Sequence, residues 1–289
     1  GYVFYSVETH FALWRMDGTS AATWIFAFII YDFFYYWFHR ISHERQIFWA
    51  SHAAHHQSED YNLSTALRQT GTGAFVSWVF YIPMFVIGIP SYVFISVASL
   101  NLIYQFWVHS EHIPKLGWYE NYFVTASNHR VHHAQNEQYI DKNYGGVFII
   151  WDRMFGTHKV EDENEACIYG IRSTLNTFNP VWANLHVYVK IIKEMWLSKN
   201  WKEKFYAPFA RTSWTPKSLP IKANKDNFNA QTFKKYDPVI SKRHKAYALF
   251  QYLFITYIFL VFIQSGYLNY PQLWVTISMM TFTMYCTSM

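Results

Sequence analysis

Residues 38–56 read FHRISHERQIFWASHAAHH and contain five of the fourteen histidines of this 289-residue chain. An apolar run, residues 21–38, leads directly into this stretch. The run approaches the roughly 20 residues that a tilted helix needs to cross a bilayer. His39 and His43 are four residues apart, so a continuing helix places both on one face where it leaves the membrane. The pattern predicts a membrane helix whose end carries metal-binding side chains.

The second part of this stretch has the spacing HxxHH, which recurs in residues 129–133. In a helix, the last two histidines of HxxHH diverge by about 100° and can serve two different ions. A further pair, three residues apart, ends the apolar run of residues 92–108. The ten grouped histidines, all candidate metal ligands, are His39, His43, His52, His55, His56, His109, His112, His129, His132 and His133.

Packing so many imidazoles together would depress their pKa values strongly unless a cation organised them. Neutral imidazole suits iron, zinc and copper. Ten rings exceed the four to six positions that one ion offers, so the sequence predicts two ions. The same histidines are also compatible with a non-catalytic membrane protein that stores or senses zinc.

Three carboxylates near these histidines are candidate catalytic residues. Asp32 lies seven residues before His39, inside an apolar span where a charge costs about 2.5 to 3.5 kcal/mol. We expect it to accept a hydrogen bond from a ligand histidine. Glu44 directly follows His43, and Glu111 lies inside the pair that ends the run 92–108.

The composition suits a protein that lies partly in lipid. Hydrophobic residues make up 52% of the chain, aromatic residues 21% and charged residues 15%, which excludes disorder and a coiled coil. We expect an all-α integral membrane protein with about four to five membrane helices and a cytoplasmic helical cap that holds a histidine-rich dimetal site. A break at residues 88–91 predicts a tight helical hairpin. The apolar runs are 21–38, 73–89, 92–108, 246–264 and 273–286.

The distribution of charge suggests the orientation and the domains. Fourteen of the 24 lysines and arginines lie between residues 190 and 245, which indicates a cytoplasmic segment beside anionic lipid and makes nucleic acid an unfavoured partner. We expect a membrane core with its cap in residues 1–205, a basic linker in 206–245 and C-terminal membrane helices in 246–289. Two distant cysteines suggest neither a disulfide framework nor a thiolate metal site.

The motifs HRISH, HAAHH and NHRVHH resemble the three histidine boxes of the fatty acid hydroxylase and sterol desaturase superfamily. Residues 35–69 and 140–157 are similar to its alkylglycerol monooxygenase branch, and the resemblance extends over about residues 24–169. It implies a di-iron centre, in which zinc can replace iron, that activates O2 and attacks a C–H bond of a lipid from the bilayer. The eight box histidines are the implied ligands, joined by His109 and, less clearly within this branch, by His112.

The same resemblance implies tetrahydrobiopterin as the electron donor and the ether-linked carbon of an alkylglycerol as the target. Glu44 and Trp49 are the residues that we expect to contact the pterin. The chain shows no G-x-G-x-x-G motif and too few cysteines for an iron–sulfur cluster, so electrons are expected from outside. A hydroxylase or desaturase of sterols, fatty acids or sphingoid bases with a protein electron donor is the alternative. No obligate protein partner is evident, and the active site is expected on the cytoplasmic face, of the endoplasmic reticulum in a eukaryote or the inner membrane in a bacterium.

Overall fold

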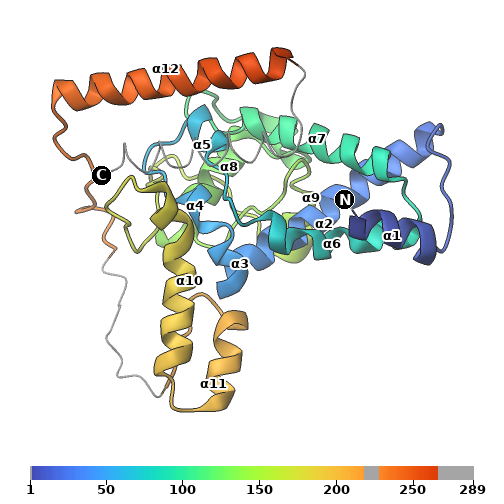
Figure 1. Cartoon of the computed structure of the whole chain (residues 1–289), viewed down its shortest axis with the longest axis horizontal. Coiled ribbons are helices and arrows are strands. Elements are labelled where there is room, and N and C mark those ends of the chain that lie inside the picture. Colours follow the sequence, from blue (N-terminus) through green and yellow to red (C-terminus); the bar gives the residue numbers. More distant parts are fainter. Residues whose placement is uncertain (1, 218–227, 266–289) are drawn as a thin grey trace.

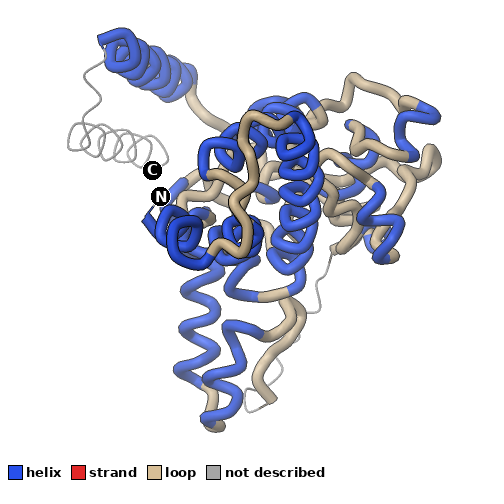
Figure 2. The backbone as a smooth tube through the Cα atoms, turned by 90° about the vertical axis from the view of Figure 1, so that its right-hand side faces the viewer, coloured by secondary structure: helices blue, strands red, loops and turns tan. Residues whose placement is uncertain are grey.

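A computed structural model describes residues 2–217 and 228–265 of the chain. Within these ranges the chain consists of helices and loops and forms no β-strand (Figure 2). The predicted all-α class is therefore confirmed for the described residues. The α-helices are α1 (Tyr2–Phe11), α2 (Ala21–Glu44), α3 (Gln46–Ala50), α4 (Ala53–His56), α5 (Leu63–Leu67), α6 (Ala74–Ile87), α7 (Ser91–Trp107), α8 (Ala126–His133), α9 (Ile150–Phe155), α10 (Pro180–Leu197), α11 (Trp201–Tyr206) and α12 (Lys242–Ser265).

α2 has the length and the apolar composition of a membrane-crossing helix, and it alone does so among the helices of the described residues. α6 and α7 are apolar but have only 14 and 17 residues. The predicted run 246–264 lies within α12, and the run 273–286 lies outside the described residues. The expected number of membrane helices thus remains a prediction.

α2, α6 and α7 share an apolar core. It contains Ala27 and Tyr31 of α2, Phe85 of α6 and Val97 of α7, all buried. The predicted break between α6 and α7 is confirmed at Gly88, which adopts a left-handed conformation with φ +101°. A side chain at Gly88 would also collide with the carbonyl of Trp14, so only glycine fits this turn.

The short helices and long loops gather at the end of α2 that carries the histidines (Figure 1). α2 ends at Glu44 because Arg45 is extended, and α3 and α4 follow at once. α10 packs across both, with Val187 and Ile191 buried against Ala50 and Ala53. This arrangement collects the histidine motifs from distant parts of the sequence at one place.

Candidate metal centre

Nine of the ten grouped histidines lie in two adjacent groups. His39, His43, His52, His56 and His132 form group 1, and His55, His109, His129 and His133 form group 2. Within each group, one ring nitrogen per residue lies within 4.8 Å of all the others. The groups touch where the rings of His56 and His133 stack with centroids 4.2 Å apart. Each group offers enough nitrogen ligands for one ion.

Helix geometry explains how the chain divides its histidines. Consecutive residues on a helix point about 100° apart. His55 and His56 of α4 therefore enter different groups, and so do His132 and His133 of α8. One turn of each short helix supplies ligands to both groups, which holds the two groups at a short distance from each other.

The ring nitrogens of His55 and His109 need a cation between them. Their Nδ1 atoms lie 3.2 Å and 2.8 Å from the carbonyl oxygens of Arg68 and Gln105. A carbonyl only accepts hydrogen bonds, so each neutral ring carries its proton on Nδ1 and has a lone pair on Nε2. The two Nε2 atoms face each other at 3.3 Å. Burial lowers the pKa of His55 to about 3 and that of His109 to about 4, so a proton does not fill this position near neutral pH.

In group 1, too, backbone carbonyls hold ring Nδ1 atoms, and Nε2 atoms are left for a cation. The Nδ1 of His39 donates to the carbonyl of Tyr144 at 2.9 Å, and that of His132 donates to the carbonyl of Lys142 at 3.0 Å. The Nε2 atoms of His43 and His132 are buried without a hydrogen-bond partner. Burial, together with the neighbouring imidazoles, holds the pKa of His132 well below its usual range. Neutral, inward-facing nitrogens without protein partners fit a divalent metal ion.

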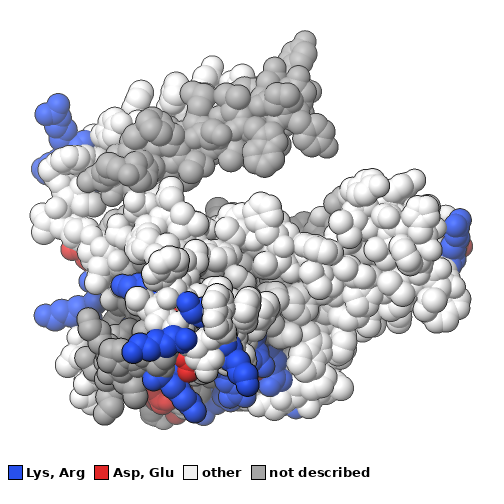
Figure 3. All heavy atoms as spheres, turned by 60° about the horizontal axis from the view of Figure 1, so that its bottom comes forward, with Lys and Arg blue, Asp and Glu red and all other residues white. Residues whose placement is uncertain are grey.

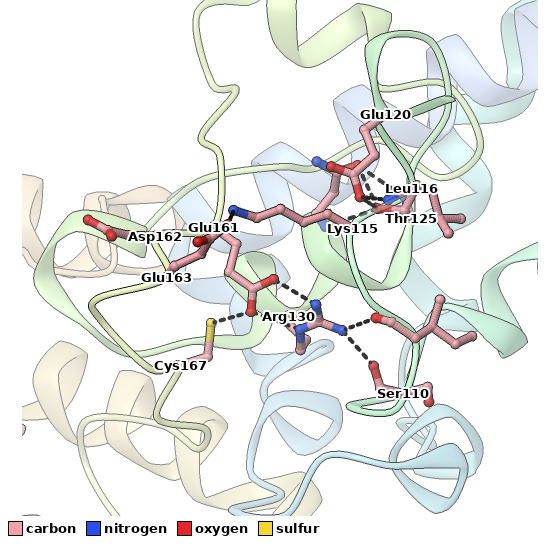
Figure 4. A network of polar contacts seen from close by, with 12 residues as sticks. Ser110, Lys115, Leu116, Glu120, Thr125, Arg130, Glu161, Asp162, Glu163 and Cys167 are labelled. Carbon is pink, nitrogen blue, oxygen red and sulfur yellow. Dashed lines mark hydrogen bonds and ion pairs between the residues drawn. The ribbon is translucent and has the colours of Figure 1, made fainter. Parts of the chain in front are cut away.

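α8 is fixed by its cap and by an arginine. Thr125 and Asn128 form a reciprocal capping box at its start. Arg130, between His129 and His132 in the sequence, pairs with Glu161 at 2.7 Å (Figure 4). It also donates to the carbonyl of Ser110 at 3.0 Å, beyond the end of α7. Burial acts to raise the pKa of Glu161, but the Arg130 guanidinium holds it below its usual value. Arg130 thus ties α8 to two loops.

The prediction that Asp32 accepts a hydrogen bond from a ligand histidine is wrong. Asp32 is fully buried and accepts four hydrogen bonds from other groups. Its Oδ1 accepts from Asn101 at 2.7 Å and from the backbone N–H of Val147 at 2.8 Å. Its Oδ2 accepts from the backbone N–H of Phe148 and from the indole of Trp151, both at 3.0 Å. Asp32 therefore holds the loop 144–148 instead of a ring.

A second buried carboxylate, Asp152, completes this support and was not foreseen. It accepts hydrogen bonds from the backbone N–H groups of Tyr144 and Gly145, both at 2.7 Å. Burial raises the pKa of Asp152 to about 6. Tyr144 supplies the carbonyl that orients His39, so the two aspartates act on group 1 through one loop. A signal in the sequence was the acid in the run IIWDRMFGT, residues 149–157.

The remaining candidates lie at different distances from the groups. His112 and Glu111 are exposed, and the structure does not bring either of them to a group. The prediction that His109 and His112 share one helix face is wrong, because α7 ends at Trp107, before both residues. Glu44 is half-buried and pairs with Arg40 at 2.8 Å, not with a histidine.

Two aromatic rings border the groups. The ring of Trp49 lies 5.2 Å from that of His43 and 5.7 Å from that of His56, at the edge of group 1. Tyr61, which sequence reasoning did not select, covers group 2. Its ring stacks on that of His109 with centroids 5.6 Å apart, and its hydroxyl donates to the carbonyl of Val108.

Residues 24–157 match the family model for fatty acid hydroxylases. This range contains all nine histidines of the two groups. Residues 24–157 of the chain are therefore similar to this family, and the predicted resemblance to the superfamily is confirmed.

The chain is also similar to curated relatives named alkylglycerol monooxygenase. The Homo sapiens protein is 45% identical over 72% of this chain and 46% of its own length. The Xenopus tropicalis protein is 43% identical over 73% of this chain and 46% of its own length. The Danio rerio protein is 40% identical over 88% of this chain and 56% of its own length. The chain thus spans about half the length of these relatives. No solved structure matches the chain.

Proposed function

We propose that this chain is a membrane-bound di-iron monooxygenase that hydroxylates a lipid C–H bond, and that it acts on the ether-linked carbon of alkylglycerols with O2 and tetrahydrobiopterin. The observation that carries the proposal is the pair of histidine groups, whose inward-facing nitrogens either face one another or, at His43 and His132, have no partner. The similarity to alkylglycerol monooxygenases at 40 to 45% identity supports the choice of reaction and of substrate.

Two iron ions, when bound, supply the redox chemistry that oxidises a strong C–H bond, which zinc lacks. In this reaction one oxygen atom of O2 enters the lipid and the other leaves as water, with two electrons taken from the pterin. The protein itself holds the rings in place. The carbonyls of Tyr144, Arg68 and Gln105 each orient one imidazole, and the burial of seven of the nine histidines limits the access of bulk water.

The apolar surface of α2, α6 and α7 supports a membrane location. Ile25 of α2, Phe75 of α6 and Ile103 of α7 are 62%, 78% and 68% exposed. Figure 3 shows a broad white part of the molecule on the right, with charged side chains only at its tip, and lysines and arginines gathered at the lower left. With α2 in the bilayer, the histidines at its end lie at the interface, where a lipid can enter sideways. The basic side is then cytoplasmic, facing away from the endoplasmic reticulum lumen or the periplasm.

Glu44 and Trp49 are the proposed contacts of the pterin. Both lie beside group 1, and Trp49 offers a flat ring next to His43 and His56. A carboxylate can accept hydrogen bonds from the amino groups of the pterin, and an indole can stack on its ring. This placement would bring the donor to the edge of one metal group.

The test is incubation of the iron-loaded protein under ¹⁸O2 with reduced pterin as sole donor and a panel of lipids, followed by mass spectrometry. We expect one labelled oxygen in the alkylglycerol product. Glu44→Gln should abolish pterin-driven turnover while iron stays bound, whereas Glu163→Gln, at an exposed position, should change neither. Turnover that occurs only with a ferredoxin or cytochrome, on a sterol or fatty acid, would refute the assignment to alkylglycerols and pterin.

A further inference from the structure

α10 carries apolar side chains on two opposite faces. One face is buried: Val187 and Ile191 pack against α3 and α4, and Ala183 is buried as well. The other face is exposed, and its residues are three and four positions apart, so that they form one continuous stripe. The stripe consists of Trp182, Leu185, Val189, Ile192 and Trp196, and their exposed fractions rise along the helix from 42% to 82%.

α11, which follows α10, carries two more exposed aromatic side chains. Trp201 and Phe205 are each 70% exposed, and their rings stack with centroids 6.1 Å apart. α10 and α11 together project from the body of the molecule as a hairpin, residues 180–206 (Figure 1). Large aromatic side chains gathered in this way on a projecting element mark a binding surface, because single exposed apolar residues are common but contiguous ones are not.

The exposed charge on the hairpin is positive. Lys190, Lys193 and Lys202 are exposed, and the ammonium group of Lys204 lies 5.0 Å from the centre of the Trp201 ring. Glu194, by contrast, is buried and accepts a hydrogen bond from Gln46. A helical element with large aromatics on one side and lysines beside them has the chemistry of an interfacial membrane anchor that prefers anionic lipid.

The direction of the hairpin agrees with this partner. α10 runs transverse to α2, α6 and α7 (Figure 1). A helix transverse to a membrane-crossing helix lies along the bilayer surface. α10 packs on α3 and α4, which directly follow the end of α2, so it lies at the level where α2 would leave the membrane. A second copy of the chain is a less suitable partner, because a two-fold contact would bring the lysines of both hairpins together.

We propose that the α10–α11 hairpin lies in the membrane interface, with its apolar stripe and the Trp201–Phe205 pair in the acyl boundary and its lysines on anionic headgroups. This inference rests on the proposed membrane location of α2. Because α10 packs on α3 and α4, the hairpin also sets the height of His52, His55 and His56 relative to the lipid surface. It thus positions the second histidine box against the bilayer from which the substrate comes.

The experiment measures the depth of a nitroxide label on the full chain reconstituted into phosphatidylcholine vesicles, with and without phosphatidylserine. The label is introduced by Trp196→Cys in a background of Cys167→Ser and Cys286→Ser. Collisions with lipid-soluble O2 and with a water-soluble nickel chelate are compared by electron paramagnetic resonance. We expect the label at position 196 to collide mainly with O2, and more so when phosphatidylserine is present. Glu163→Cys, at a side chain 83% exposed, is the matched aqueous control.

Two further labels or variants separate the outcomes. A label at Ile25→Cys reports whether α2 lies in lipid. If position 25 is in lipid while position 196 collides with nickel, or is shielded from both agents by protein, the hairpin proposal is overturned and the membrane location of α2 stands. If position 25 also meets water, the proposed function itself fails. Lys193→Glu with Lys202→Glu should abolish the effect of phosphatidylserine, whereas Lys234→Glu, exposed elsewhere, should preserve it.

Discussion

Replacing Asp32 with Asn should weaken both the fold and metal binding, although Asp32 touches no histidine of the two groups. Each carboxylate oxygen accepts two hydrogen bonds, at 2.7 and 2.8 Å on one and at 3.0 Å twice on the other. Asparagine keeps one acceptor and places an NH2 group where the second was. The two N–H groups that had donated to the replaced oxygen would then face the NH2 group of asparagine, itself a donor, in a fully buried site.

The size of the effect follows from these contacts. A hydrogen bond to a charged group contributes about 1.5 to 3 kcal/mol, so the loss of two costs about 3 to 6 kcal/mol. Removing a buried charge offsets part of this, which leaves a net loss of about 2 to 4 kcal/mol in the free energy of unfolding. The loop that presents the Tyr144 carbonyl to His39 should loosen, and iron affinity should fall by about 10- to 100-fold.

The assay compares the thermal midpoint and the iron content of Asp32→Asn with those of wild type in detergent. The matched control is Asp162→Asn, the same change at an exposed carboxylate, which accepts a hydrogen bond from the backbone N–H of Asn164. We expect the control to keep the midpoint and the iron of wild type. An Asp32→Asn protein that behaves like the control would refute the argument that this carboxylate supports the metal groups through the loop 144–148.

Three further predictions concern the groups and their supports. His109→Ala should lower the iron content by about half, whereas His112→Ala should leave it unchanged; equal loss in both variants would contradict the placement of His112 outside the groups. In the unfolded, metal-free chain, a histidine binds a proton below its ordinary pKa of 6.5, whereas in the folded protein the pKa of His109 is lowered to about 4. The unfolded state therefore binds more protons between these two values, so the free energy of unfolding should fall as the pH falls through this range. Each such histidine contributes up to about 1.4 kcal/mol per pH unit, and a melting midpoint of chelated protein that rises on acidification would refute this. Glu161→Gln should cost about 1 to 3 kcal/mol through its pair with Arg130, read as a lower midpoint, with Glu163→Gln as the silent control.

The sequence predicts the structure best where the spacing of neighbouring residues decides the geometry. The separation of His55 from His56 follows from the 100° step of a helix, and the break at Gly88 follows from its position between two apolar runs. Such features depend only on residues a few positions apart. The same reasoning failed for His112, because it assumed that the helix continues past Trp107, where it ends.

Contacts between distant segments could not be predicted from one sequence. Three of the four partners of Asp32 lie at residues 147–151, more than 110 positions away along the chain. The Nδ1 atoms of His39 and His55 bind backbone carbonyls, which every residue has and no pattern marks. For the same reason the supporting role of Asp152 became visible only in the structure.

A titration of metal-free protein with iron tests for a two-iron centre, when bound iron per chain and alkylglycerol hydroxylation with reduced pterin are followed on the same sample. The two histidine groups predict that the chain binds two irons and that turnover appears as the second iron binds. Maximal turnover with one iron per chain, or turnover supported by zinc alone, would contradict a two-iron centre.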